Sequence, residues 1–526
     1  MTIRIQNEIT RRGLLRGAAT GTLALAGTLA MPAYVRAQSR PIITHGLQSG
    51  DIGATHGVMW ARADRPSKAI IEWSTTESFA DARRLPALDA LPETDYAVKI
   101  LAEGLPADQQ VFWRVQFHDL ADINAVSEPM TASFRTAPTE KREVSFVWSG
   151  DTAGQGWGID EDRGGMTIYA TMLKHRPDFF IHSGDTVYAD GPMKETVDLK
   201  DGTVWKNVMI EEKAEVAESL ADFRGQYKYN MMDRNVQAFN AAVPMLAQWD
   251  DHEVTNNWSP SKTLDERYGE KSVYVLAARA ARAFHEMMPT ATSLSEPQRI
   301  YRKVAYGPLL DVFFIDMRTY RAANSDNTQP QEGAETVFLG ADQRAWLKQE
   351  LKASRATWKV IAADMPLGLI VWDDGKNKKG SEAIANADNG PAAGRELEFA
   401  DLLKFIKDER ILNTVWLTAD VHYTAAHYYS PEKAAFQDFE PFWEFVSGPL
   451  HAGTFGPNDL DMTFGPEVRY VKAPTPEQGA NLPPSMGLQF YGHVRIAPDS
   501  EVMTVTLRDV ADADLWSIDL EPKRAS

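Results

Sequence analysis

From residue 142 onward, short apolar runs alternate with segments in which apolar residues recur every three or four positions. Apolar runs bounded by turn residues indicate buried strands, and the longer spacing indicates amphipathic helices. The predicted strands are Val144–Trp148, Phe179–His182, Met245–Trp249, Leu310–Ile315, Lys359–Ala363 and Val415–Thr418. The predicted helices are Met166–His175, Val273–His285, Ala341–Ser354 and Glu396–Glu409. This alternation predicts an α/β fold with helices around a buried sheet.

Residues 41–138 follow a different pattern, in which short runs of β-branched and aromatic residues are separated by Gly, Pro and Asp. The candidate strands are Val58–Arg62, Ala69–Trp73, Tyr96–Ile100 and Val111–Val115. Such runs predict an N-terminal β-sandwich of the immunoglobulin or fibronectin III kind. The segment Ala137–Lys141 reads as a linker to a second domain, predicted over residues 142–522.

Residues 1–37 resemble a twin-arginine export signal. Arg11 and Arg12 precede a mild apolar run, Ala18–Ala30, and Val35 and Ala37 stand where signal peptidase prefers small residues. The run is shorter than the roughly 20 apolar residues that a membrane-spanning helix needs. We therefore expect export by the twin-arginine machinery and cleavage after Ala37. The mature protein would be periplasmic or secreted, with no stable membrane anchor.

Composition narrows the possible functions. The 526 residues are 44% hydrophobic, which is enough for a large core, and they carry a formal charge of −18. This negative charge argues against a surface that grips a phosphate backbone, so we expect no nucleic-acid partner. The chain contains no Cys, which excludes disulfides, thiolate metal sites and cysteine nucleophiles. Any metal must be bound by oxygen ligands and imidazole.

Acidic residues directly follow five of the predicted strands. They are Asp151, Asp185, Asp250 with Asp251, Asp364, and Asp420, and His252 and His422 lie beside two of them. Open α/β sheets build sites at the carboxyl ends of their strands, so these carboxylates are expected to converge. A single acidic residue could merely cap a helix or start a turn. Five together would repel one another without a cation, which predicts a polyvalent metal centre of iron(III), manganese, magnesium, calcium or zinc.

Several blocks of the sequence resemble a known family. Gly184–Tyr188 is similar to the GDxxY pattern of purple acid phosphatases. Further blocks are Gly46–Asp51, Trp60–Arg62, Trp249–Glu253, Asp316–Arg321, Leu339–Leu347 and Asp420–Tyr423. In this order they resemble the PhoD-type alkaline phosphatase and phosphodiesterase family of the calcineurin-like metallophosphoesterases. The resemblance implies a catalytic β-sandwich core flanked by helices and a binuclear or larger metal centre.

The resemblance also implies roles for individual residues. The ligands of an iron(III)-like metal would be Asp151, Asp185, Tyr188 as phenolate, and His422. The ligands of a second metal would be Asp185, Asp251, Asp364 and Asp420, with Asn256 nearby. This second metal would be calcium, with magnesium, manganese or zinc as alternatives. Many relatives have Cys at the position of Asp151, so the carboxylate makes this site harder and closer to the purple acid phosphatase pattern.

The implied reaction is attack of a metal-activated water on a small-molecule or polymer phosphate ester. His252 is the predicted general acid, because imidazole titrates near neutrality, and Glu253 would orient it. Arg318 is a candidate for substrate binding, although a structural salt bridge explains it equally well. Two alternatives remain open: a diester-specialised phosphodiesterase of phospholipase D-like activity, and a non-catalytic metal- or phosphate-binding protein on the same scaffold.

Overall fold

The computed structural model of this chain describes residues 40–524. The predicted export signal lies outside these residues. Within them, no helix is both long and apolar enough to cross a membrane.

The N-terminal region consists mainly of antiparallel strands, as its sequence pattern predicts, with one short 3-10 helix at Pro92–Thr94. Its strands are β1 (Ile43–Gly50), β2 (His56–Ala63), β3 (Ser67–Ser74), β4 (Arg83–Arg84), β5 (Leu88–Ala90), β6 (Ala97–Glu103), β7 (Gln110–Asp119) and β8 (Met130–Arg135). Strands β3, β4, β5, β7 and β8 form one sheet, while β1, β2 and β6 lie in another. Burial alternates residue by residue along β7, so one of its faces packs into the core and the other faces outward.

The rest of the chain contributes to two large sheets, and the first of them also contains β1, β2 and β6 of the N-terminal region. The first has nine strands in the order β25-β24-β23-β9-β10-β13-β1-β2-β6. Its further strands are β9 (Val144–Ser149), β10 (Phe179–Ser183), β13 (Met245–Gln248), β23 (Phe490–Ile496), β24 (Met503–Asp509) and β25 (Asp514–Leu520). Gly50 of β1 pairs with Met245 of β13, so the N-terminal region shares this sheet with the following region.

The second large sheet has seven strands in the order β14-β15-β16-β19-β21-β20-β22. They are β14 (Arg302–Ala305), β15 (Leu310–Phe314), β16 (Trp358–Ala362), β19 (Thr414–Thr418), β20 (Thr424–Tyr429), β21 (Phe442–Val446) and β22 (Pro466–Lys472). Two small hairpins lie in the long connections: β11 (Thr196–Asp198) with β12 (Val204–Lys206), and β17 (Trp372–Asp374) with β18 (Lys379–Ser381).

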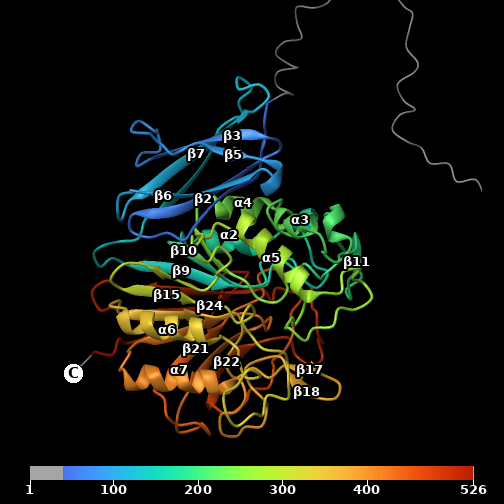
Figure 1. Cartoon of the computed structure of the whole chain (residues 1–526), viewed down its shortest axis with the longest axis vertical. Helices are drawn as coiled ribbons and strands as arrows, with labels where there is room; N and C mark the ends of the chain where they lie inside the picture. Colours follow the sequence, from blue (N-terminus) through green and yellow to red (C-terminus); the bar gives the residue numbers. More distant parts are fainter. Residues whose placement is uncertain (1–39, 525–526) are drawn as a thin grey trace, which may run out of the picture. The chain divides into compact units, whose positions relative to one another are not determined.

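The helices cover the outer faces of the two sheets. They are α2 (Thr167–Leu173), α3 (Leu220–Asn230), α4 (Arg234–Asn240), α5 (Val273–Met287), α6 (Ala341–Ala353) and α7 (Glu396–Asp408). Figure 1 shows α6 and α7 lying side by side, and α3 next to α5. The four helices predicted from sequence are all present, and no end differs by more than two residues from the prediction.

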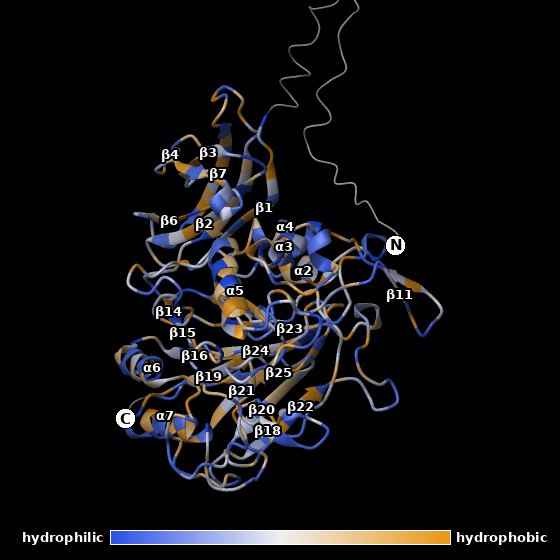
Figure 2. Cartoon of the chain, turned by 45° about the vertical axis from the view of Figure 1, so that its right-hand side comes forward, coloured by the Kyte–Doolittle hydropathy of each residue, from blue (hydrophilic) through white to orange (hydrophobic). Residues whose placement is uncertain are grey.

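Side chains of the central strands alternate between a hydrophobic core shared by the two sheets and an outer core beneath the helices of their own sheet. Trp148 of β9 and Phe314 of β15 belong to the core shared by the two sheets. The adjacent Val147 belongs to the core that includes residues of α2 to α5, and Phe313 to the core that includes residues of α6 and α7. Both faces of each central strand are therefore buried, which explains why these strands read as continuous apolar runs. Along α5, hydrophobic and hydrophilic residues are interspersed (Figure 2), and the buried ones lie on one side of the helix.

Candidate metal centre

The acidic residues that follow the central strands converge, as predicted. Asp151 follows β9, Asp185 follows β10, and Asp250 and Asp251 follow β13 in one sheet. Asp364 follows β16 and Asp420 follows β19 in the other sheet. Since the strands of each group run parallel, their carboxyl ends lie at one edge of the sandwich.

The backbone turns sharply where it enters the site. The φ angles of Asp151, Asp185, Asp420 and His422 are 67°, 49°, 67° and 59°, in the left-handed region that is uncommon for residues other than Gly. Gly184 has φ 105°, and a Cβ atom there would lie 2.5 Å from the Cβ of Asp250. Left-handed residues at several ligand positions are typical of functional sites, where packing holds the strained backbone.

Three overlapping groups of side chains have ligand atoms that all lie within 4.8 Å of one another. They are Asp151, Asp185 and His422; Asp185, Asp251 and His252; and Asp250, Asp251 and Asp420. Asp185 and Asp251 each belong to two of the groups, which is the position expected of a ligand shared by two metals, and Asp185 was the predicted bridge. Asp250 was not among the predicted ligands, although it precedes Asp251 in the same block.

Tyr188 reaches the first of these groups. Its Oη lies 2.8 Å from Nε2 of His422, and its ring packs 4.3 Å from the ring of His252. Burial, together with the nearby charges of Asp185 and Asp151, raises the pKa of the phenol well above its usual value. The phenol therefore stays protonated here unless a cation offsets these carboxylates. The other nitrogen of His422 contacts the carbonyl oxygen of Gly453, which leaves Nε2 directed toward the site.

The buried carboxylates are not satisfied by protein groups alone. Both oxygens of Asp151 and one oxygen each of Asp250, Asp251 and Asp364 lack a hydrogen-bond partner among residues 40–524. Burial first, and neighbouring carboxylates second, raise the pKa of Asp151, Asp185 and Asp364 well above that of a free aspartate. Unpaired buried anions are costly, and hard oxygen donors of this kind fit polyvalent cations. The donor set therefore fits the predicted metal centre.

Arg318 lies among these carboxylates and is fully buried. Its Nε donates to Asp250 at 2.6 Å and its Nη1 contacts Glu382. Its Nη2 lies 3.8 Å from Asp420. These contacts fit the structural salt bridge that was the alternative to substrate binding, because the guanidinium compensates the charge of the surrounding carboxylates. Glu382, which lies in a long connection, was not found from the sequence.

His252 is held by a residue that the sequence did not indicate. Its Nδ1 lies 2.6 Å from Oδ1 of Asp190, whose other oxygen accepts the backbone N–H of Asn256 at 2.9 Å. Burial disfavours the imidazolium, but the carboxylates of Asp190 and Asp251 outweigh burial and raise the pKa of His252 to about 9. Asp190 stands only two positions after Tyr188. Its place beside the GDxxY block is the feature of the sequence that could have indicated a role in the site.

Two predicted site residues are placed differently. Glu253 does not orient His252, because its oxygens accept hydrogen bonds from the backbone of Thr186 at 2.6 Å and of Asp250 at 2.8 Å. Glu253 instead ties the loop after β10 to the loop after β13. The predicted ligand Asn256 is exposed, and its backbone N–H, rather than its side chain, makes the contact with Asp190 described above.

Exposure shows from which side the centre is open. The side chain of Asp420 is 19% exposed and that of His252 is 12% exposed. Asp151, Asp250, Asp251 and Asp364 are at most 3% exposed. The centre is therefore open to solvent on the side of Asp420 and His252.

Comparison with known proteins agrees with this geometry. The model of the family described as PhoD-like phosphatase matches residues 146–507, and that of its N-terminal domain matches residues 28–138. Alkaline phosphatase D of Bacillus subtilis (strain 168) is 28% identical over 401 residues, which are 72% of this chain and 64% of the Bacillus protein. The match thus spans less than two thirds of that relative.

Two solved structures share the fold. A structure of PhoD superposes with a TM-score of 0.66 at 22% identity, covering 91% of this chain and 88% of that one. The structure of a purple acid phosphatase from yellow lupin (Lupinus luteus) seeds superposes with a TM-score of 0.57 at 10% identity, covering 92% and 74%. The fold and the resemblance expected from the sequence are thereby confirmed.

Proposed function

This chain belongs to the PhoD-like phosphatase family, and from that premise we propose that it is a metal-dependent hydrolase of phosphate esters. The observation that carries the proposal is the set of buried carboxylate oxygens without hydrogen-bond partners among residues 40–524, grouped around Asp185. A fold stabilised only by its own contacts would pair or exclude such charges. In a site that binds cations and a phosphate ester, the same carboxylates would be the ligands of the cations.

The residues would hold two metals. The first would be bound by Asp151, Asp185, Tyr188 and His422, and the second by Asp185, Asp251, Asp364 and Asp420, with Asp250 beside them. The phenol of Tyr188 favours iron(III) in the first position, and the all-oxygen set favours calcium, or magnesium or manganese, in the second. When bound, such a pair polarises a phosphoryl oxygen and lowers the pKa of water.

His252 would donate the proton that the leaving oxygen requires. With Nδ1 engaged by Asp190, Nε2 is the nitrogen available for proton exchange. The raised pKa keeps the imidazole protonated at neutral pH, as a general acid must be. Arg318 would hold the buried carboxylates in place, and Glu253 would fix the spacing of the two ligand loops.

The cellular location and the domain organisation of the enzyme are also proposed from its sequence. Residues 1–37 would direct export through the twin-arginine machinery, giving a periplasmic or secreted protein. Residues 41–138 would form the N-terminal β-sandwich domain and residues 142–522 the catalytic domain. The substrate would be a small-molecule or polymer phosphate ester.

The test combines metal content with turnover. Purified protein is assayed by elemental analysis, and with p-nitrophenyl phosphate and bis-p-nitrophenyl phosphate, beside the matched variant Asp185→Asn. We expect about two metal ions per chain and turnover of at least one ester in the native protein, and loss of both in the variant. Preference for the diester would indicate a phosphodiesterase. Full metal content without turnover of any ester would overturn the proposal.

A further inference from the structure

A second pocket lies at the amino-terminal ends of the parallel strands of the nine-stranded sheet, whereas the metal centre lies at their carboxyl ends. A pocket of about 960 Å³ is lined at this edge by residues that precede or begin three parallel strands: Glu143 and Ser145 at β9, Arg176, Pro177 and Asp178 at β10, and Ala242 and Val243 at β13. Four of the metal-centre carboxylates, Asp151, Asp185, Asp250 and Asp251, follow the other ends of the same strands. Strands of four to six residues separate the two sites by roughly 13–20 Å.

The lining of this pocket is rich in arginine, in a chain whose net charge is −18. Four arginines, Arg135, Arg142, Arg176 and Arg495, line it together with two carboxylates, Glu143 and Asp178. Arg135 comes from the N-terminal region and Arg495 from β23, near the end of the chain. Segments that are distant in sequence thus contribute arginine side chains to the same pocket.

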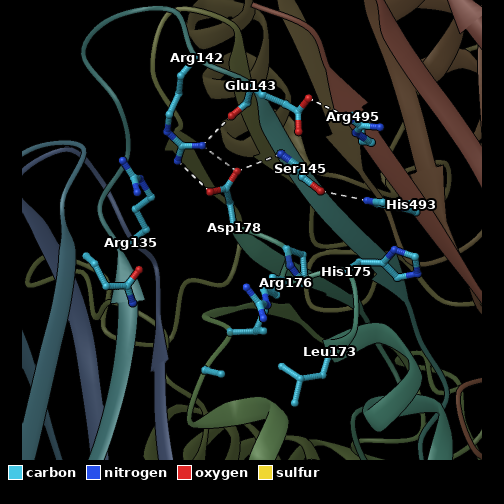
Figure 3. A pocket seen from close by; sticks show the side chains of 14 residues that line it. Arg135, Arg142, Glu143, Ser145, Leu173, His175, Arg176, Asp178, His493 and Arg495 are labelled. Atoms are coloured by element: carbon cyan, nitrogen blue, oxygen red, sulfur yellow. Dashed lines mark hydrogen bonds and ion pairs between the residues drawn. The ribbon is translucent and has the colours of Figure 1, made fainter. Parts of the chain in front are cut away.

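The carboxylates of the pocket are already paired. Asp178 accepts hydrogen bonds from Arg142 at 2.8 Å and from the backbone N–H of Ser145 at 2.9 Å. Glu143 accepts one from Arg495 at 2.6 Å. Each carboxylate of the lining is thus paired with an arginine, and the contacts with Asp178 hold Arg142 in a fixed position (Figure 3).

Donor groups remain free after this pairing. The guanidinium of Arg176 makes no hydrogen bond or ion pair within the part of the chain that the structure describes, and Figure 3 shows this side chain in the middle of the pocket with no dashed line. Arg495 uses only Nη2, and Nη1 of Arg135 has no partner in residues 40–524. The pocket therefore offers several guanidinium N–H donors and few free acceptors.

We propose that this pocket binds the phosphate groups of an anionic ligand, distinct from the ester at the metal centre. Guanidinium groups bind phosphate oxygens through two parallel hydrogen bonds, and these are among the stronger hydrogen bonds in proteins. The volume lies within the range of sites for small organic molecules, and is ample for more than one phosphate group. Because Gln110 and Arg135 of the N-terminal region line the same pocket as Arg176 and Arg495, a bound anion joins the two regions.

Calorimetric titration tests the proposal, with orthophosphate and tripolyphosphate as probes. The titration uses the Asp185→Asn protein, so that binding at the metal centre does not contribute. The pocket variant Arg176→Ala/Arg495→Ala is compared with the control Lys174→Ala/Lys472→Ala, which removes the same charge from exposed positions outside the pocket. We expect the pocket variant to lose at least tenfold in affinity and the control to lose less than twofold.

The two probes show whether the ligand carries one phosphate group or several. Tighter binding of tripolyphosphate identifies a ligand with several phosphate groups, because one molecule then reaches more than one arginine. Equal affinities identify single phosphate groups. Equal losses in the pocket variant and the control, or no saturable binding to the Asp185→Asn protein, would overturn the proposal. The readout is binding, so it is independent of whether the enzyme turns over esters.

Discussion

Nδ1 of His252 lies 2.6 Å from Oδ1 of Asp190, and this single contact decides which imidazole nitrogen can exchange a proton. His252→Ala should therefore retain both metals but lose rate according to the leaving group. An alkoxide needs a full proton in the transition state and a nitrophenolate needs little, so we expect losses of about 10²–10⁴-fold with alkyl phosphates and much smaller ones with p-nitrophenyl phosphate. Equal losses with both would assign His252 to phosphate or metal binding.

Asp190→Asn should act through His252. The carboxylate holds the pKa of the imidazole at about 9, so its removal lowers that pKa and moves the alkaline limb of the pH–rate profile to lower pH. We expect the rate with alkyl phosphates to fall by roughly 10–100-fold, as for other orienting partners. Glu253→Gln is the control, because Glu253 contacts Thr186 and Asp250 and not the imidazole. A shift of the limb in Glu253→Gln alone would contradict this assignment.

Tyr188→Phe tests the identity of the first metal. If Tyr188 binds iron(III) as phenolate, the purified protein should show a broad visible charge-transfer band, and this band should disappear in the variant. The ring packs against His252, so phenylalanine keeps the packing and removes only the oxygen. Circular dichroism checks the fold. A colourless, iron-free and fully active native protein would remove Tyr188 from the ligand set and indicate two divalent metals.

Replacing Arg11 and Arg12 together by Lys tests the export signal. The twin-arginine machinery reads the two guanidinium groups, so the variant should stay in the cytoplasm as uncleaved precursor. Cell fractionation and the mass of the product measure this outcome, and the native precursor is the control. Export and cleavage of the double variant would show that another route is used.

The sequence predicted the part of the site that follows the strands and missed the part contributed by long connections. Asp151, Asp185 and Asp420 could be found because each stands directly after an apolar run, and the sheet then determines where it lies. Asp190 and Glu382 lie in irregular segments whose course depends on tertiary packing. No periodicity marks such positions, so their contacts with His252 and Arg318 emerged only from the structure.

Residue type also left the roles of two side chains undecided. An arginine after a strand can bind a phosphate or compensate buried carboxylates, and only the complete burial of Arg318 distinguishes these roles. The glutamate next to His252 in the sequence was predicted to orient it. The turn after β13 instead directs Glu253 to the backbone of the neighbouring loop. Adjacent residues in such a turn point in different directions, which sequence spacing does not reveal.

Arg318→Met should separate charge compensation from substrate binding. Removing one partner of a buried ion pair leaves an uncompensated charge and costs about 3–5 kcal/mol, so the free energy of unfolding should fall by about this amount. We expect weaker metal binding and a lower Tm, with KM changed less than twofold for the molecules that retain both metals. The control is Arg344→Met, whose arginine pairs with Glu332 near the surface. An increase in KM at unchanged Tm would instead place Arg318 on the substrate.

Metal removal should reverse the usual effect of pH on stability. Burial raises the pKa of Asp151, Asp185, Asp364 and Asp420 in the folded chain well above the value near 4 of the unfolded chain. The folded state then binds more protons than the unfolded state, so the free energy of unfolding falls as pH rises above about 4. After chelation, Tm should therefore be higher at pH 5.5 than at pH 8, whereas bound cations remove this dependence. The native protein with and without EDTA, melted across this range, measures the effect. A chelated protein whose Tm rises with pH would show that these carboxylates are ionised and paired without metal.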